Sequence, residues 1–282
     1  MHEHVTIDLS GVKKDDDCHL DCFEETVREF RQLYEYGVRN ILDVTNRGMG
    51  RNPEYVARVE AATGIRILLS TGFYKEPFLP QEVYDNTVEE LAGLISRELT
   101  EGIGSSGPHA SVIGEFGTSK DRMMPMEEKV FEAMALAAVR TGAPVSTHTT
   151  LGTCGREQLD YLTARGVKPE KIIIGHMDLS QDLEKILDLL SRGANVGFDT
   201  IGKLNYSPDT FRVAALKEIH RQGMLSQVVL SMDITRKTHL RYKGGIGYSY
   251  LFEAFLPLLE EHGFTQEQID LLLIDNPRRI LG

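Results

Sequence analysis

Short runs rich in valine and isoleucine alternate along the chain with longer amphipathic stretches. Most of the runs follow a glycine or a proline, as strands that come after tight turns do. Their apolar character is nearly continuous, which is typical of strands that are buried on both faces and therefore parallel. The runs are Val38–Thr45, Ile65–Phe73, Ser111–Thr118, Pro144–Thr149, Lys171–Asp178, Ala194–Thr200 and Gln227–Asp233.

The stretches between the runs place apolar residues at helical spacing. The clearest of them are Glu127–Thr141, Asp182–Arg192 and Phe211–Arg221. Each stops at or near a glycine, such as Gly142, which is a residue that commonly ends helices. Thr265 and Gln268 form a capping box that opens a last helix, and this helix should end before Pro277.

The start of the chain, His2 to His4, supplies a fragment of an eighth strand. Eight strand–helix units in 282 residues predict an α/β fold of the (β/α)8 type, the TIM barrel. No linker or composition break divides the chain, so we expect residues 1–282 to form a single domain. A doubly wound open sheet is the alternative, but no glycine-rich phosphate motif follows the first strand.

Composition narrows the class of protein. The chain is 41% hydrophobic and 26% charged, as expected of a globular protein with a sizeable core. Its net charge of −11 argues against nucleic acid and against an anionic membrane surface as partners. No signal peptide is recognisable, and no apolar run approaches the ~20 residues of a membrane helix. Three cysteines are too few for a disulfide framework, which favours a cytoplasmic location.

Candidate chemistry gathers at the carboxyl ends of the predicted strands, where barrel active sites lie. His2 and His4 stand one residue apart, so in a strand their side chains point to the same face. Four further strands contribute Glu115, His148, His176 and Asp233. A single histidine after a strand is more often an ordinary polar residue than a ligand. Here, however, four of the nine histidines fall on one face.

Six such groups exceed the needs of one tetrahedral zinc ion. They suit two divalent ions that share a bridging carboxylate and a hydroxide. A carboxylate in an apolar strand, such as Glu115, is costly to bury unless a cation accompanies it. Nitrogen and carboxylate ligands favour Zn²⁺, with Mn²⁺, Fe²⁺ and Co²⁺ as alternatives.

The segments around these residues resemble those of the phosphotriesterase-related proteins of the amidohydrolase superfamily. The similarity extends over essentially the whole chain, and through VIGEFGTS, STHT, FDTIGK and LSMDIT it is strongest to the phosphotriesterase homology protein subgroup. The matching segments are His2-Glu3-His4, Glu115, Ser146-Thr147-His148-Thr149, Ile174-Gly175-His176-Met177-Asp178, Ser231-Met232-Asp233 and Asn276-Pro277 with Leu281.

Chemistry and resemblance together imply a role for each candidate ligand. His2, His4 and Asp233 would hold the more buried ion, His148 and His176 the more exposed one, and Glu115 would bridge the two. The bridging water would be the nucleophile of a hydrolysis, with Asp233 as the group that receives its proton.

The chain departs from true phosphotriesterases in two ways. Those enzymes bridge their metals with a carboxylated lysine. This chain has Glu115 instead and so resembles the branch of the family that has a glutamate, which argues against triesterase activity. In addition, only Met1 precedes the first histidine, although a strand usually has about five or six residues. We therefore expect the natural chain to begin upstream of Met1.

Basic and aromatic residues in the predicted loops are candidates for substrate contacts. Arg236 and Lys237 follow the last strand, Lys203 follows the strand before it, and Tyr74 follows the third strand. The last two loops of this fold commonly bind phosphate. If these side chains bind substrate rather than being ordinary solvated charges, the substrate is an anionic small molecule. A lactone or carboxylic ester that bears phosphate or carboxylate is the first choice, and a neutral phosphotriester or other phosphoester is the second.

Other classes of function stay open at this stage. A metal-dependent isomerase or decarboxylase could use the same ligands, and so could a metal-binding homologue without catalytic activity. A homodimer is compatible with the sequence. Asp178 could orient His176 from outside the ligand set, and Asp199 could be a helix cap or a substrate contact.

Overall fold

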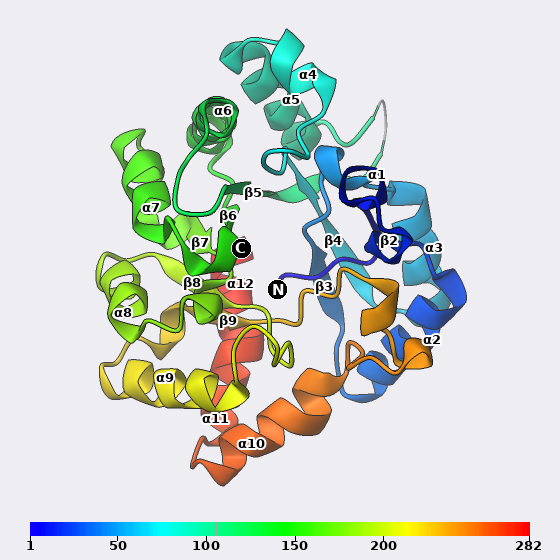
Figure 1. The fold of residues 1–282 in the computed structure, drawn as a ribbon, viewed down its shortest axis with the longest axis vertical. Helices are drawn as coiled ribbons and strands as arrows, with labels where there is room; N and C mark the ends of the chain where they lie inside the picture. Colours follow the sequence, from blue (N-terminus) through cyan, green and yellow to red (C-terminus); the bar gives the residue numbers. More distant parts are fainter. Residues whose placement is uncertain (105–106) are drawn as a thin grey trace.

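The computed structural model describes residues 1–104 and 107–282 as a parallel sheet curled into a barrel and surrounded by helices (Figure 1). Seven strands pair in chain order, and each is parallel to the next. Each lies within or overlaps one of the seven predicted runs, so the prediction of a parallel sheet is confirmed. They are β3 (Asn40–Asp43), β4 (Arg66–Thr71), β5 (Ala110–Thr118), β6 (Val145–Thr149), β7 (Ile172–Ile174), β8 (Asn195–Phe198) and β9 (Val228–Leu230).

The start of the chain occupies the gap between β3 and β9. The N–H of Glu3 donates to the carbonyl of Leu42 at 3.0 Å, and the N–H of Val44 donates back to the carbonyl of Glu3 at 3.0 Å. On the other side, the amine of Met1 donates to the carbonyl of Leu230 at 3.5 Å. The predicted first strand is thus a single parallel bridge. It fills the first position of the barrel, which confirms the (β/α)8 fold.

Helices cover the outer face of the barrel. The predicted helices over 127–141, 182–192 and 211–221 are confirmed as α6, α8 and α9. The helices are α2 (Phe23–Glu35), α3 (Pro53–Thr63), α4 (Gln81–Asp85), α5 (Val88–Thr100), α6 (Pro125–Thr141), α7 (Gly155–Ala164), α8 (Leu183–Ser191), α9 (Asp209–Arg221), α10 (Leu256–Glu261), α11 (Gln266–Asp270) and α12 (Asn276–Leu281). Within the described ranges, no helix is long and apolar enough to cross a membrane.

The last helical segment does not end before Pro277, and that expectation was wrong. Thr265 and Gln268 do form the predicted capping box at the start of α11. The chain then passes through a π-helical stretch, Leu271–Asp275, and continues as α12 with Pro277 in its first turn. A proline is tolerated in the first turn of a helix. The π-helical turn before it is wider and changes the pattern of i→i−4 hydrogen bonds that the proline ring would otherwise obstruct.

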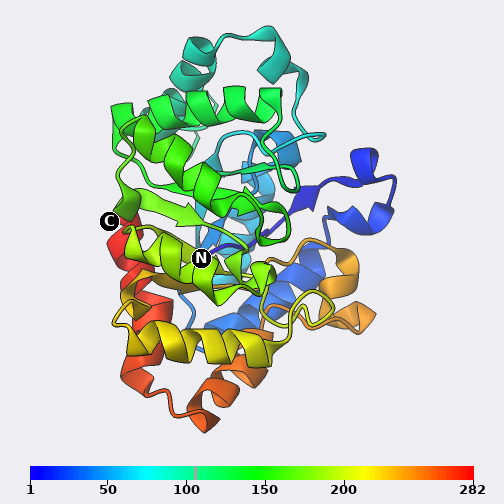
Figure 2. The ribbon, with the colours of Figure 1, turned by 60° about the vertical axis from the view of Figure 1, so that its left-hand side comes forward.

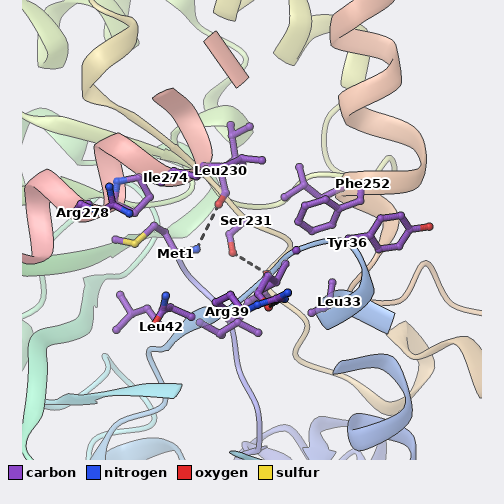
Figure 3. Close-up of a pocket in the computed structure, with 18 of the residues that line it drawn as sticks. Met1, Leu33, Tyr36, Arg39, Leu42, Leu230, Ser231, Phe252, Ile274 and Arg278 are labelled. Atoms are coloured by element: carbon purple, nitrogen blue, oxygen red, sulfur yellow. Dashed lines mark hydrogen bonds between the residues drawn. The ribbon is translucent and has the colours of Figure 1, made fainter. Parts of the chain in front are cut away.

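The two ends of the barrel differ. At the carboxyl ends of the strands, a small hairpin of β1 (Ile7–Asp8) and β2 (His19–Leu20), with helix α1 (Ser10–Lys13), projects beside the mouth (Figure 2). At the amino ends, a hollow of about 840 Å³ opens around Met1 (Figure 3). Its walls are mostly apolar, with Leu42, Leu230 and Phe252 among them.

Candidate metal centre

Four histidines converge on Glu115 at the carboxyl ends of the strands. Atom Oε2 of Glu115 lies 3.3 Å from Nε2 of His2, 3.2 Å from Nδ1 of His148 and 3.5 Å from Nε2 of His176. The other oxygen, Oε1, lies 3.4 Å from Nε2 of His4. One carboxylate therefore reaches side chains from β6, from the loop after β7 and from the start of the chain.

Asp233 completes the cluster from the loop after β9. Its Oδ1 lies 3.3 Å from Nε2 of His4 and 3.8 Å from Nε2 of His2. Its Oδ2 accepts a hydrogen bond from Nζ of Lys203. Burial opposes ionisation of Asp233, but the charge of Lys203 and the neighbouring ring of His4 hold the pKa of this carboxyl far below its usual range.

The cluster contains two groups that could each hold a cation. One comprises His2, His4 and Asp233, and the other comprises His2, Glu115 and His176. In each group the candidate ligand atoms lie within 4.8 Å of one another. The first group has the same members as the more buried site expected from the sequence.

Buried nitrogen atoms without partners point into this cluster. The exposed fractions are 3% for His2, 0% for His4, 2% for Glu115 and 3% for His176. Among the described residues, both ring nitrogens of His2 and the Nε2 of His4 have no hydrogen-bond partner. Burying such atoms unpaired is costly. A divalent cation in the cluster would satisfy the Nε2 atoms of His2 and His4, and imidazole nitrogen with carboxylate oxygen is a donor set that fits such a cation.

Neighbouring groups fix which nitrogen of His4 faces the cluster. The hydroxyl of Thr45 donates its only proton to the carbonyl of Thr6, at 2.8 Å. It therefore accepts from Nδ1 of His4, also at 2.8 Å. Nδ1 then carries the proton, and the lone pair of His4 sits on Nε2, which is the atom directed at Glu115.

Asp199 orients His176 in the same manner. Its Oδ1 accepts from both the backbone N–H of His176, at 2.9 Å, and Nδ1 of that ring, at 2.7 Å. Its Oδ2 lies 3.5 Å from Nδ1 of His2. Gly197 leaves room for this carboxylate, because a Cβ at that position would meet the oxygen of Asp199. The sequence left the role of Asp199 open, and no spacing signal pointed to it.

Charge within the cluster shifts the pKa values of its members. Burial opposes ionisation of Glu115, but the charge of His2 and the neighbouring rings of His148 and His176 outweigh it and hold the Glu115 pKa well below its ordinary value. Burial and the neighbouring His176 lower the pKa of His148 to about 4. The ring of His148 is therefore neutral near pH 7 and has a lone pair available.

Two of the six candidates have a strained backbone. The φ angle is +57° at His176 and +51° at Asp233, which is the left-handed region that residues other than glycine seldom adopt. Such a conformation costs on the order of 1–3 kcal/mol and is concentrated at functional sites. Both residues lie in the turns just after short strands, β7 and β9, where the chain must turn sharply to direct the side chain inward.

A cavity of about 270 Å³ lies over the cluster, and three of the four predicted substrate contacts line it. Tyr74 packs against His148, with its hydroxyl 3.3 Å from Nδ1 of that ring. Lys203 lines the cavity while it holds Asp233. Arg236 lines it as well. Sequence reasoning missed Lys13 and His239, which also line the cavity. No motif signalled them.

The structure pairs the basic residues after β9 with acidic residues near the start of the chain. Arg236 donates to Asp15 at 2.8 Å and lies 3.4 Å from Asp17. Nζ of Lys237 lies 3.1 Å from Asp21. Lys237 is not among the residues that line the cavity, so the structure does not bring this predicted substrate contact to the site.

Asp178 does not orient His176, although its position two residues away suggested that role. Its Oδ2 accepts instead from Nε of Arg212 at 2.6 Å and from the hydroxyl of Thr200 at 2.6 Å. Arg212 is fully buried and also donates to Asp209 at 2.7 Å. The pair supports the loops beneath the cluster and has no contact with the cavity.

The arginines that follow β3 are ion-paired away from the cluster. Arg51 donates two hydrogen bonds to Glu98, at 2.7 and 2.9 Å, and Arg47 donates one more at 2.7 Å. Burial opposes ionisation of Glu98, but the hydrogen bond and charge of Arg51 hold its pKa below the ordinary value. This pairing therefore contributes to stability in a pH-dependent way.

We expect Glu98→Gln to lower the free energy of unfolding at pH 7 by about 3 kcal/mol, since it leaves buried arginine charge unpaired. Because the folded pKa of Glu98 is depressed, its contribution is present above the unfolded pKa of about 4.3 and is lost as the pH falls through the folded pKa. Urea titrations from pH 7 to pH 3 should show the difference between wild type and variant shrinking below about pH 4. A difference that is independent of pH would contradict the assignment.

The fold and the cluster define a class of protein, the (β/α)8-barrel enzymes whose site is built from histidines and carboxylates where the strands end. Within that class, the chain belongs to the phosphotriesterase family, whose model matches residues 1–281. The resemblance seen in the sequence motifs is thereby confirmed. As a member of this family, the protein is a metal-dependent hydrolase.

Individual relatives agree with this placement. The phosphotriesterase homology protein of Escherichia coli strain K12 is 45% identical over 98% of this chain and 94% of its own length. A crystal structure of the Escherichia coli protein, with phosphate in its active site, has a TM-score of 0.97 at 44% identity and covers 100% of this chain and 97% of that one. A lactonase from Listeria monocytogenes has a TM-score of 0.94 at 28% identity and covers 100% of this chain and 93% of that one.

Proposed function

We propose that this protein is a zinc-dependent hydrolase with two metal ions that opens lactones bearing an anionic group. The observation that carries the proposal is Glu115, a buried carboxylate whose two oxygens face different sets of histidines. That arrangement fits a ligand shared by two cations and is more than a single ion requires. Two bound divalent ions would supply a Lewis acid and lower the pKa of water towards about 7.

The residues would divide between the two ions as the sequence motifs imply. His2, His4 and Asp233 would hold one ion. His148 and His176 would hold the other, and their facing nitrogens, Nδ1 and Nε2, lie 2.8 Å apart. Zinc suits this set of nitrogen and carboxylate donors, and manganese, iron or cobalt could take its place.

Asp233 is placed to receive the proton that an attacking water gives up. Its Oδ1 faces the cluster, and Lys203 holds its Oδ2, so the carboxylate has a fixed direction. A general base needs this hydrogen-bond reach to the group that it deprotonates. Thr45 and Asp199 keep the rings of His4 and His176 turned towards the same point.

The charges around the cavity support an anionic substrate. The cationic side chains of Lys13, Lys203 and Arg236 all line it, in a chain whose net charge is −11. Phosphate occupies the active site of the Escherichia coli relative, and the Listeria relative is a lactonase. A phosphorylated or carboxylated lactone combines these features. A neutral phosphotriester would make no use of these cations, so it is the less favoured substrate.

The test is a panel of lactones, esters and phosphotriesters offered to the metal-loaded protein, with acid release as the readout. We expect roughly two metal equivalents per chain. A phosphorylated lactone should have a kcat/KM at least ~10-fold above its neutral analogue, the value of one charge-assisted hydrogen bond. Lys203→Met and Arg236→Met should each reduce that preference.

Each alternative has its own outcome in this panel. Equal rates on neutral and anionic lactones would exclude an anion subsite. Turnover of a substrate without stoichiometric release of acid would identify an isomerase. A purified protein that contains no metal would leave only a binding function. A faster rate on phosphotriesters than on any lactone would reverse the order of substrates.

A further inference from the structure

Glu3, the residue between the first two histidines, is a buried carboxylate to which the metal-centre argument gives no role. It is 7% exposed. Its Oε1 accepts from the hydroxyl of Ser231 at 2.7 Å and from the backbone N–H of Met232 at 2.7 Å, and its Oε2 accepts from the N–H of Ile234 at 3.2 Å. Ser231 and Met1 both line the hollow at the amino ends of the strands (Figure 3).

These hydrogen bonds enclose Asp233 on both sides. Met232 and Ile234 are its two chain neighbours, and each gives its N–H to a different oxygen of Glu3. Asp233 itself has a φ of +51°, a conformation that needs support from its surroundings. The carboxylate of Glu3 provides that support through the backbone N–H groups of the residues on either side of Asp233.

Glu3 is not itself a candidate ligand. Neither of the two candidate metal-binding groups in the described residues includes it. Both of its oxygens are already occupied by donors from the segment after β9. Its neighbours His2 and His4 point into the cluster, and residues alternate in an extended segment, so Glu3 points the other way. It thus joins the start of the chain to the segment that follows the neighbouring strand β9.

We propose that Glu3 is a positioning residue, which fixes the carboxylate of Asp233 by clamping the two peptide groups around it. The inference rests on the proposed function, because it assumes that Asp233 binds metal and receives a proton. It adds a role for the middle residue of the His-x-His segment. Partners outside the ligand set commonly govern metal affinity and activity by 10- to 100-fold.

The chain offers a matched control in Glu29 of α2. This carboxylate is 5% exposed and accepts from the backbone N–H groups of Arg241 and Tyr248, both at 2.8 Å. It therefore clamps the same long segment after β9 with the same chemistry, at residues that are not chain neighbours of Asp233. Loss of either clamp should destabilise that segment, but only Glu3 adjoins Asp233.

The experiment compares Glu3→Gln with Glu29→Gln in the full-length, metal-loaded protein. Glutamine keeps the size of the side chain but turns one acceptor oxygen into a donor. For Glu3→Gln we expect zinc affinity, measured by competition with a chelator, to fall ~10- to 100-fold at one of the two sites. On a substrate identified by the lactone panel, kcat should fall by a similar factor while KM stays unchanged. Glu29→Gln should lower the melting temperature and change neither quantity.

The inference is overturned if Glu3→Gln behaves like Glu29→Gln, with lower stability but wild-type zinc affinity and kcat. If Glu3→Gln does not fold, Glu3→Asp takes its place and is compared with Glu29→Asp. A wild-type protein that binds no metal would overturn the proposed function together with this inference. If the wild type binds metal and is active, but the Glu3 variant keeps the wild-type zinc affinity and kcat, this inference alone is overturned.

Discussion

Replacing Glu115 with alanine is expected to remove metal and activity together. All four histidines of the cluster lie within 3.5 Å of this carboxylate, so its loss leaves both candidate cation sites without their shared anion. A metal pair contributes several kcal/mol of transition-state stabilisation, which corresponds to at least ~10³-fold in kcat. Elemental analysis of the purified variant should find at most about one metal ion per chain.

Glu127 supplies the control for that variant. It is fully buried, like Glu115, and accepts from the backbone N–H groups of Ser119 and Met124 at 3.0 and 2.8 Å. Glu127→Ala should therefore lower stability while the metal content and kcat stay close to those of the wild type. A Glu115→Ala variant that still carried two metal ions per chain would show that Glu115 does not bridge them.

The barrel and its ligand cluster could be predicted because both follow from regular spacing. Parallel strands that are buried on both faces appear as continuous apolar runs, and their carboxyl ends meet at one mouth. A histidine or carboxylate just after such a run is therefore near the others, whatever the separation in sequence. His176 and Asp233 were placed in this way, although neither lies within a strand of the structure.

The residues that hold the ligands could not be predicted, because they depend on which loops touch. Asp199 orients His176 across 23 positions, and Thr45 orients His4 across 41. Nothing in either local sequence marks such a pair. The same limit applies to Arg236, whose guanidinium meets Asp15 from a distant loop. Basic residues beside the site could be listed from the sequence, but their partners could not.

The course of the last helix shows a second limit. Pro277 is a strong signal for the end of a helix. A π-helical stretch over Leu271–Asp275 changes the backbone pattern just before it, and the segment resumes as α12. Asn276, in the first turn of α12, donates to the carbonyls of Leu225 and Val228. Tertiary contacts at the start of β9 thus accompany a helix that local preference would have ended.

The second large effect is expected at Arg212, which lies outside the ligand cluster. Its side chain is fully buried and ion-paired with Asp178 at 2.6 Å and with Asp209 at 2.7 Å. It also donates to the carbonyl of Thr200 at 2.7 Å. Arg212→Met fills much of the same space but leaves two carboxylates without their cation. Removing one partner of a buried ion pair costs about 3–5 kcal/mol.

For a chain of this length, that loss corresponds to a fall in melting temperature of roughly 10 °C, which calorimetry of the apoprotein would detect. Arg221→Met is the control on the same helix, because its pair with Glu218 is exposed and should leave the melting temperature nearly unchanged. Adding Asp178→Asn to Arg212→Met should restore part of the lost stability, since it removes a carboxylate left unpaired. If the double variant were no more stable than Arg212→Met, the cost would lie in lost packing rather than in the buried charge of Asp178.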